Sequence, residues 1–356
     1  MPVEGFMRRR RVARSSQYEV GWASPHERRQ ADAFLADLMG ISARGLYGRT
    51  SPGSRGRFES ESDEAEAAPV TLPAGFRMGV WLDVGGKSLA DNGATHASRL
   101  HALGITDACI MINPLDSTSF GFGSVSQARI RTFVALLRGS AIRLTLTSWL
   151  RPSRTFIDAL VRDLPSFARE VGARIEFDVE EPWTSNSPSG FTTHDEAADH
   201  LFAGLRRAEV SEVAVTCQVD QTDRARMRAM VRHADIVIPQ AYSTKGTASS
   251  HAVGGTYGPR GLQRRAAQKV ADAVAASGKP IIMGLAAYGR TGWPGQSARD
   301  IMTMELEETV SLRSSHTIQG ARYWSWKHIA GFNGKLGNPS NSYANGFLKD
   351  IALPPS

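Results

Sequence analysis

Acidic and apolar side chains alternate in the segment R-I-E-F-D-V-E-E-P-W, residues 174–183. Successive side chains of a β-strand point to opposite faces, so this alternation predicts a strand with one apolar face. The other face carries Glu176, Asp178 and Glu180, which lie about 7 Å apart from one to the next. Like charges held in a site with little water raise the pKa of at least one carboxyl group. Such a group keeps its proton near neutral pH and can serve as a general acid.

An exposed sheet face would also explain these acidic residues. In that interpretation Arg174 and solvent neutralise the acidic face, and the segment has no chemical role. The position of the strand in the fold decides between the two interpretations.

Eight segments have the pattern of strands, and a helix-like segment follows each of them. The strands are expected at residues 77–84, 107–113, 142–149, 174–180, 212–218, 235–242, 279–288 and 320–326. The helices are expected at residues 95–104, 126–140, 153–172, 193–209, 222–233, 261–278, 297–315 and 341–353. This alternation predicts an α/β fold, a (β/α)8 TIM barrel over residues 75–353. A doubly wound open sheet is the alternative, but the glycines after the first strand match neither phosphate-loop spacing.

Catalytic groups of a TIM barrel lie at the C-terminal ends of its strands. The residues expected there are Asp83, Asn113, Trp149, Glu180, Gln218, Gln240, Tyr242, Tyr288, Trp324 and Trp326. Aromatic rings stack on the apolar faces of sugars, and amides and carboxylates bind the hydroxyl groups. The sequence therefore favours a polysaccharide over nucleic acid as the partner, with the acidic face of the fourth strand turned toward the barrel axis.

The barrel segment, about residues 76–352, resembles the family 18 glycoside hydrolases, which are chitinases and their relatives on polymers containing GlcNAc. The family's fourth strand ends in D-x-x-D-x-D-x-E, and this chain has A-R-I-E-F-D-V-E at 173–180, where Asp178 and Glu180 match. P-Q-A-Y at 239–242, G-L-A-A-Y-G-R at 284–290 and G-A-R-Y-W at 320–324 are similar to the ends of its sixth, seventh and eighth strands.

Three positions depart from the family's pattern. Ala173 and Glu176 stand where the family has its first two aspartates, and Ala286 replaces the usual proline. The family's second aspartate shares a proton with the middle one. Glu176 could still do this for Asp178, with a longer side chain.

The resemblance implies retaining hydrolysis of a β-linked N-acetylhexosamine polymer, chitin-like or peptidoglycan, in which the substrate's own N-acetyl oxygen attacks the anomeric carbon. Glu180 would protonate the leaving oxygen and then activate water. Asp178 would hold the acetamido N–H, Tyr242 would donate to the acetamido oxygen, and Trp324 would pack under the sugar. Glu176 and the other strand-end residues would line the substrate site. No metal and no organic cofactor is implied.

Other interpretations fit parts of the sequence. A family 25 lysozyme-like muramidase also ends a barrel strand in D-x-E and has an aspartate after its first strand, as at Asp83, but its D-x-S pattern is absent here. A glycan-binding barrel without turnover is argued against by Glu180, because such relatives usually lose the acid. A component of a phage-like delivery particle is the remaining alternative.

Residues 1–74 differ in composition from the rest of the chain. Five arginines lie within residues 8–14 and contribute to the formal net charge of +7. Residues 48–69 are rich in Gly, Ser and Pro and then acidic, with little to bury, which predicts disorder. A short helix is expected at about 26–39. The segment is expected to be a basic extension, and the sequence favours a solvated disordered tail over the alternative of docking to an anionic surface or a protein partner.

Cys109 and Cys217 are the only cysteines, and their separation excludes a disulfide framework, so buried thiols are expected. No stretch of 18 apolar residues occurs, so no membrane span is expected. No apolar segment follows the arginine run, so no secretory signal is expected. We expect synthesis in the cytoplasm and release, if any, by lysis or a dedicated export device.

Overall fold

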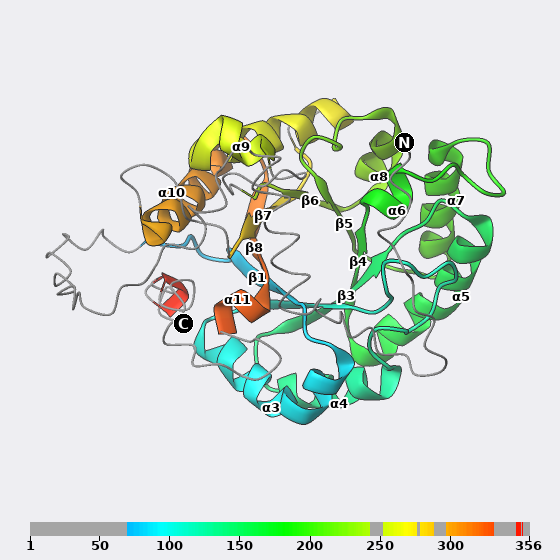
Figure 1. The fold of residues 1–356 in the computed structure, drawn as a ribbon, viewed down its shortest axis with the longest axis horizontal. Helices are drawn as coiled ribbons and strands as arrows, with labels where there is room; N and C mark the ends of the chain where they lie inside the picture. Colours follow the sequence, from blue (N-terminus) through cyan, green and yellow to red (C-terminus); the bar gives the residue numbers. More distant parts are fainter. Residues whose placement is uncertain are drawn as a thin grey trace, which may run out of the picture. The chain divides into compact units, whose positions relative to one another are not determined.

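The computed structural model describes residues 70–242, 252–275, 278–287, 297–330, 347–349 and 351, with backbone alone for 252–257. Eight parallel strands close into a barrel in the order β1 to β8 (Figure 1). The strands are β1 Arg77–Leu82, β2 Asp107–Met111, β3 Arg143–Trp149, β4 Arg174–Asp178, β5 Val213–Gln218, β6 Ile236–Gln240, β7 Ile281–Ala286 and β8 Ile318–Trp324. The predicted TIM barrel is confirmed, and most of the predicted N-terminal extension lies outside the described residues.

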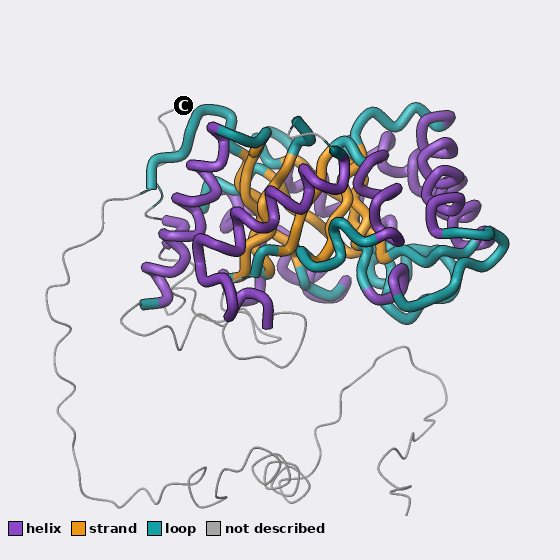
Figure 2. Tube along the Cα trace, turned by 90° about the horizontal axis from the view of Figure 1, so that it is seen from above, coloured by secondary structure: helices purple, strands orange, loops and turns teal. Residues whose placement is uncertain are grey.

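Helices surround the barrel, with the strands in the middle (Figure 2). They are α3 Gly86–Ala102, α4 Gln127–Leu137, α5 Arg154–Val171, α6 Glu181–Thr184, α7 His194–Arg207, α8 Ala225–His233, α9 Ala252–Val274, α10 Ala298–Ser311, the 3-10 turn η1 Leu312–Ser314 and α11 Trp326–Ala330. The short helices α6 and α11 were not expected from the sequence. The helix expected at 341–353 lies mostly outside the described residues. Within that range the structure describes residues 347–349, which are helical, and residue 351.

Two helices begin about nine residues earlier than the sequence predicts, and each contains a kink. Helix α3 is kinked at Asn92 and α9 at Gly258. In α3 two glycines allow close packing. A Cβ on Gly93 would lie 3.1 Å from Leu136 Cδ1 of α4, and one on Gly86 would lie 2.8 Å from Arg129 Nη1. Small residues at these positions let the two helices approach each other.

Strand β4 has the predicted orientation. Ile175, Phe177 and Val179 belong to the large apolar cluster that also holds the buried residues of the helices. Alternate residues of other strands form a second, smaller cluster inside the barrel, made of Trp81, Cys109, Ala214, Ile236, Ile238 and Ile282. The acidic face of β4 is therefore the inner face. Cys109 and Cys217 are both buried free thiols, as expected.

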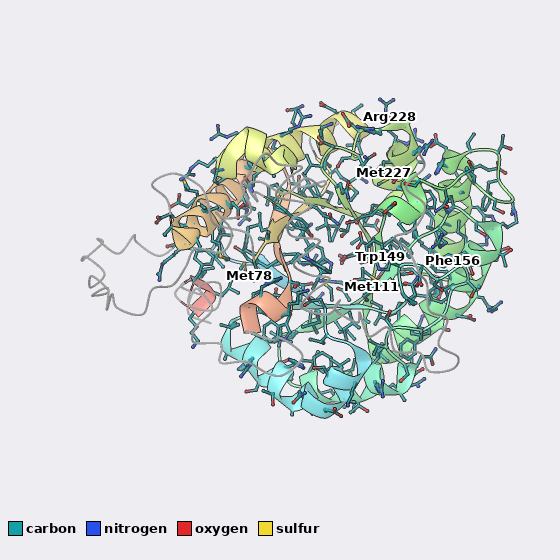
Figure 3. The ribbon with its side chains drawn as sticks, in the orientation of Figure 1. Met78, Met111, Trp149, Phe156, Met227 and Arg228 are labelled. Carbon is teal, nitrogen blue, oxygen red and sulfur yellow. The ribbon has the colours of Figure 1, made fainter. Side chains whose placement is uncertain are left out.

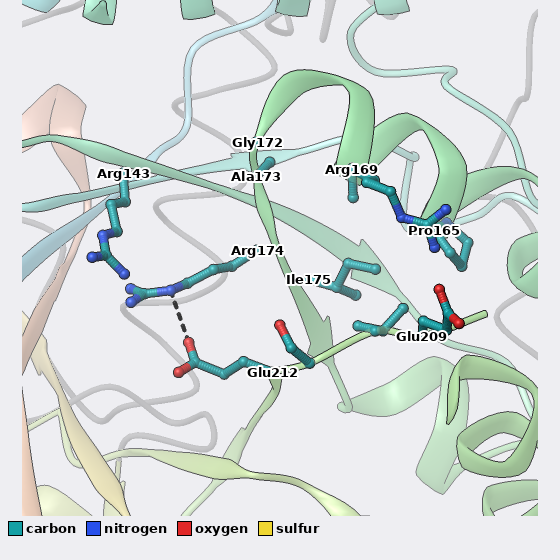
Figure 4. A pocket seen from close by; sticks show the side chains of 12 residues that line it. Arg143, Pro165, Arg169, Gly172, Ala173, Arg174, Ile175, Glu209 and Glu212 are labelled. Atoms are coloured by element: carbon teal, nitrogen blue, oxygen red, sulfur yellow. Dashed lines mark ion pairs between the residues drawn. The ribbon is translucent and has the colours of Figure 1, made fainter. Parts of the chain in front are cut away.

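Ion pairs close the end of the barrel at which the strands begin. Asp107 Oδ1 lies 2.7 Å from Arg77 Nη2 and 2.7 Å from Arg174 Nη1. Arg174 Nε lies 2.8 Å from Glu212 Oε1. A cavity of about 430 Å³ lies at this end and is lined by Arg143, Arg169 and Arg174 among others (Figure 4). Arg174 is thus used in this layer and does not neutralise the carboxylates farther along β4.

No helix in the described part of the chain is long and apolar enough to cross a bilayer.

Candidate active site

Asp178 and Glu180 lie together at the C-terminal end of β4. Asp178 ends the strand and is 5% exposed, and Glu180 follows as the residue that precedes helix α6. The next residue, Glu181, is exposed. The strand therefore directs Asp178 and Glu180 toward the barrel mouth, while the start of α6 turns Glu181 out to solvent.

Gln240, at the end of β6, joins the two carboxyl groups. Its Nε2 donates to Glu180 Oε1 and lies 3.5 Å from Asp178 Oδ1. Burial raises the pKa of Asp178 well above its ordinary value, and the charge of Glu180 raises it further. Burial also raises the pKa of Glu180, which the hydrogen bond from Gln240 lowers and the charge of Glu181 raises. The pair therefore retains a proton at a pH where ordinary carboxylates have lost theirs.

Glu176, one strand repeat below Asp178, is fully buried and does not line the mouth. Its Oε1 accepts from Trp81 Nε1 at 2.8 Å and from Thr216 Oγ1 at 3.0 Å, and its Oε2 accepts from Arg322 Nη1. Both oxygens are occupied, so Glu176 does not share a proton with Asp178 in this structure. The structure places Glu176 in the barrel core, and its predicted place in the substrate site stays a prediction.

Two tryptophans, Trp149 and Trp324, end strands of the barrel. Trp149 lies beside Asp178 in the β3–β4 register, and its backbone N–H and C=O are both bound by the side chain of Asn113, at 3.0 and 3.1 Å. Figure 3 shows Trp149 toward the middle of the barrel and Phe156 of α5 farther out. Trp324 ends β8, partly exposed, and packs edge-on against Trp81 with ring centroids 6.0 Å apart. Asn113 is itself 1% exposed, and its side-chain amide fixes the backbone of Trp149.

Asp83, at the end of β1, holds the segment that leads from β8 into α11. Its Oδ2 accepts from Ser325 Oγ at 2.6 Å, and its Oδ1 accepts from Lys327 N at 3.0 Å. Lys327 Nζ lies 3.3 Å from Asp83 Oδ2. The carboxylate of Asp83 is thus already paired with a cation and a hydroxyl.

Trp326 does not lie in the mouth, in contrast to the sequence prediction. It is fully buried, and its Nε1 donates to His96 Nδ1 at 3.0 Å, with the two rings edge-on. The strand alternation that would have directed it inward ends at Trp324, and Trp326 begins α11. Its indole packs between α11 and α3 instead.

The remaining predicted residues lie at strand ends or beyond the described part. Gln218 ends β5 and is half-buried, beside Gln240 in the β5–β6 register. Tyr242 follows β6 and is 6% exposed. Tyr288 lies outside the described residues. No cluster of three or more potential metal ligands occurs in the described part of the chain.

Sequence analysis missed three residues that contact Glu176: Trp81, Thr216 and Arg322. All three occupy inward positions of their strands. Thr216 and Arg322 each lie two residues before the last residue of their strand, so the alternation of side chains predicts that they point inward. What the pattern could not reveal is that they all meet Glu176, which lies 146 residues from Arg322 in the sequence.

No protein-family model matches this chain, and no curated protein does either. Solved structures do match. A GH113 beta-1,4-mannanase has a TM-score of 0.52 at 13% identity, covering 79% of this chain and 99% of that one. An exo-beta-1,4-mannosidase from Opitutaceae bacterium strain TAV5 has a TM-score of 0.53 at 10% identity, covering 80% and 61%. YKL-39, solved in the presence of chitooligosaccharides, has a TM-score of 0.51 at 10% identity, covering 78% and 98%.

The chain has a TIM barrel similar to those of these solved structures. Identities this low show the fold alone, and membership in family 18 stays a prediction that rests on the motifs.

Proposed function

We propose that the protein is a glycoside hydrolase that cleaves β-linked N-acetylhexosamine polymers, the class that contains chitin and the glycan strands of peptidoglycan. One observation carries the proposal. Asp178 and Glu180 are buried at the barrel mouth and, among the described residues, have no cationic partner, whereas Glu176 has Arg322 and Asp107 has two arginines. Two buried carboxyl groups without a cation hold a proton, and a held proton is what a general acid supplies.

Glu180 is assigned as the acid because it lies nearer the opening and is the less buried of the two. It gives its proton to the glycosidic oxygen as the bond from that oxygen to the anomeric carbon breaks. The substrate's N-acetyl oxygen attacks the same carbon and forms a cyclic cation, which the carboxylate of Asp178 stabilises through the acetamido N–H. Glu180, now ionised, takes a proton from water, which opens the ring with net retention.

The supporting residues follow from their positions. Tyr242 is assigned to the acetamido oxygen, and Trp324, braced by Trp81, to the face of the sugar ring. Gln240 keeps the two carboxyl groups together. The similarity of the barrel to solved glycoside hydrolases supports the reaction class, and the D-x-D-x-E-like motif supports the amino-sugar substrate.

The muramidase alternative needs Asp83 as a second catalytic carboxylate. Asp83 is bound by Ser325 and Lys327, so it is less available for that role. A barrel that only binds glycan, alone or as part of a delivery particle, would show binding without turnover. The mannan-active neighbours make a neutral hexose polymer the other substrate to test.

The test compares reducing-sugar release from chitin oligomers, peptidoglycan and β-1,4-mannan by three proteins. Wild type should act on an N-acetylated polymer and not on mannan, which has no N-acetyl group. Glu180→Gln should reduce turnover by about 10²–10⁴-fold, because an amide cannot donate the proton, while glycan binding persists. The exposed neighbour Glu181→Gln is the matched control and should be mild.

Two results would contradict the proposal. Hydrolysis of mannan without hydrolysis of either N-acetylated polymer would show that the reaction does not use an N-acetyl group of the substrate. Loss of activity in Glu181→Gln but not in Glu180→Gln would mean that the wrong glutamate has been assigned.

A further inference from the structure

Charged side chains inside the barrel lie at three levels along β4. At the level where the strand begins, Arg174 and Arg77 face Asp107 and Glu212 and are paired with them. At the middle level Glu176 faces Arg322 of β8. At the mouth lie Asp178 and Glu180. At each of the first two levels the carboxylates are paired with arginines, and the pair at the mouth lies above them.

The middle level is the part of this arrangement that the reaction does not use directly. Glu176 is fully buried and the side chain of Arg322 is 1% exposed. Trp81 and Thr216 complete the hydrogen bonds of Glu176. Burying two charges is costly unless they are paired and hydrogen-bonded, so these contacts make the two residues dependent on each other.

The backbone of β1 is adapted to this arginine. A Cβ at Gly79 would lie 3.0 Å from Arg322 Nε and 3.2 Å from Arg322 Cγ. Glycine at this position leaves room for the arginine beside Trp81, whose ring centroid lies 5.4 Å from Arg322 Cζ. The barrel therefore accommodates Arg322 in one defined place below the mouth.

We propose that Arg322 is a positioning residue of the active site: by cancelling the charge of Glu176, it leaves Asp178 and Glu180 as the only carboxyl groups of the β4 inner face that compete for a proton. The inference rests on the proposed function in one respect: it explains how a general acid stays protonated, which matters for catalysis only if Glu180 is that acid.

The effect of charge at the middle level can be isolated from that of the charged groups that the structure describes around the pair. Glu181 belongs to the pair's own segment and points to solvent. Asp83 of β1 is paired with Lys327 of α11. The thiols of Cys109 and Cys217 also lie on these strands, and burial raises their pKa values to about 11 and about 12. The hydroxyl group of Tyr242 follows β6.

Glu176→Gln tests the proposal directly. The variant leaves the arginine charge without a partner, because arginine does not deprotonate. An uncompensated cation at the level below Asp178 favours ionised carboxyl groups. The titration midpoint of the pair should fall by on the order of one pH unit. The basic limb of the pH–activity profile, where the general acid is lost, should move down by the same amount.

Two further variants make the test specific. Glu176→Gln with Arg322→Met is neutral again at the middle level and should restore the midpoint. Arg322→Met alone leaves a carboxylate below the pair, so the midpoint should not fall. The control is Glu308→Gln on the outer helices. The carboxylate oxygens of Glu308 lie 2.6 and 2.9 Å from the guanidinium nitrogens of Arg264, so this variant also removes the partner of an arginine. It should leave the titration midpoint of Asp178 and Glu180 unchanged.

The midpoint is read from the ¹³C resonances of the carboxyl groups, which need no substrate, and in parallel from the pH–activity profile. An unchanged midpoint in Glu176→Gln, or a midpoint that stays low in the double variant, would overturn the inference. If Glu176→Gln does not fold, the comparison of the double variant with Arg322→Met decides, because the inference requires the midpoint to be higher in the latter. A wild type that titrates as described but hydrolyses no glycan would refute the proposed function and leave the inference about Arg322 standing.

Discussion

At the scale of single residues, the buried carboxyl group of Asp178 suits the proposed chemistry but lowers the stability of the fold when it ionises. Its carboxyl group is buried, faces Glu180 and has no cationic partner in the described part of the chain, and its pKa is raised. A carboxyl group whose pKa is higher in the folded than in the unfolded state binds more protons when folded. Its contribution to stability is complete below the unfolded pKa, about 3.9, and is lost as the pH rises through the folded pKa.

Asp178→Asn should therefore gain stability relative to wild type as the pH rises, because an amide has no ionised form to bury. The urea midpoints of the two proteins should lie close together at pH 4 and separate at pH 8, with the variant the more stable, although its hydrolytic activity falls. A stability difference that is the same at both pH values would show that Asp178 is not buried as an ionisable group. Asp163, an exposed aspartate paired with Arg162 on α5, is the control position for Asp→Asn.

At the scale of elements, period-two alternation predicted the strands well because both faces of each strand are constrained. The apolar residues of β4 face the helices and its acidic residues face the axis. Residues 174–180 therefore alternate between acidic and apolar types. The prediction failed where a strand ends. Trp326 continues the alternation of β8 in sequence, but the chain has already turned into α11, and the indole is buried against His96.

Contacts across the barrel could not be predicted in the same way. Arg322 and Glu176 occupy inward positions that alternation identifies, but nothing local in the sequence says that they face each other. Asn113 and Asp83 illustrate the same limit. Their position at the strand ends was predicted, and their partners, Trp149 and the segment Ser325–Lys327, were not.

The fit of β1 to β8 can be tested at Gly79. A methyl group there would press on Arg322 Nε at 3.0 Å and on Asp107 Cβ at 3.3 Å. Gly79→Ala should lower the free energy of unfolding by about 1–3 kcal/mol, as overpacked cores do, measured by urea denaturation. Gly121→Ala is the matched control, since no atom lies within 4 Å of its Cβ position. Equal effects at the two glycines would mean that the space beside Arg322 is not tight.

At the scale of the whole molecule, the barrel's two ends have different roles. The end where strands begin is closed by paired charges around Asp107, as expected of the end that supports stability. The opposite end carries Asp178 and Glu180, which have no cationic partner among the described residues, and the partly exposed tryptophans. The residues that hold the fold together and those assigned to chemistry thus lie at different ends of the barrel.

The composition of the N-terminal segment leads to a prediction about the chain as a whole. Residues 1–69 contain the arginine run and the Gly/Ser/acidic stretch, which have little apolar surface to bury. Val70 and Leu72, by contrast, belong to the barrel core at 8% and 3% exposure, slightly before the predicted boundary at residue 75. A protein that starts at residue 70 should therefore melt within a few degrees of the full chain and hydrolyse glycan at a similar rate.

The matched control is a protein that starts at residue 74. Its loss of Val70 and Leu72 uncovers the core, and by analogy with large-to-small core substitutions it should cost about 2–5 kcal/mol of the free energy of unfolding. Thermal melts and urea denaturation of the three proteins measure both effects. If the protein that starts at residue 70 keeps its melting temperature but loses hydrolysis, the extension takes part in activity, and the barrel by itself is not the complete enzyme.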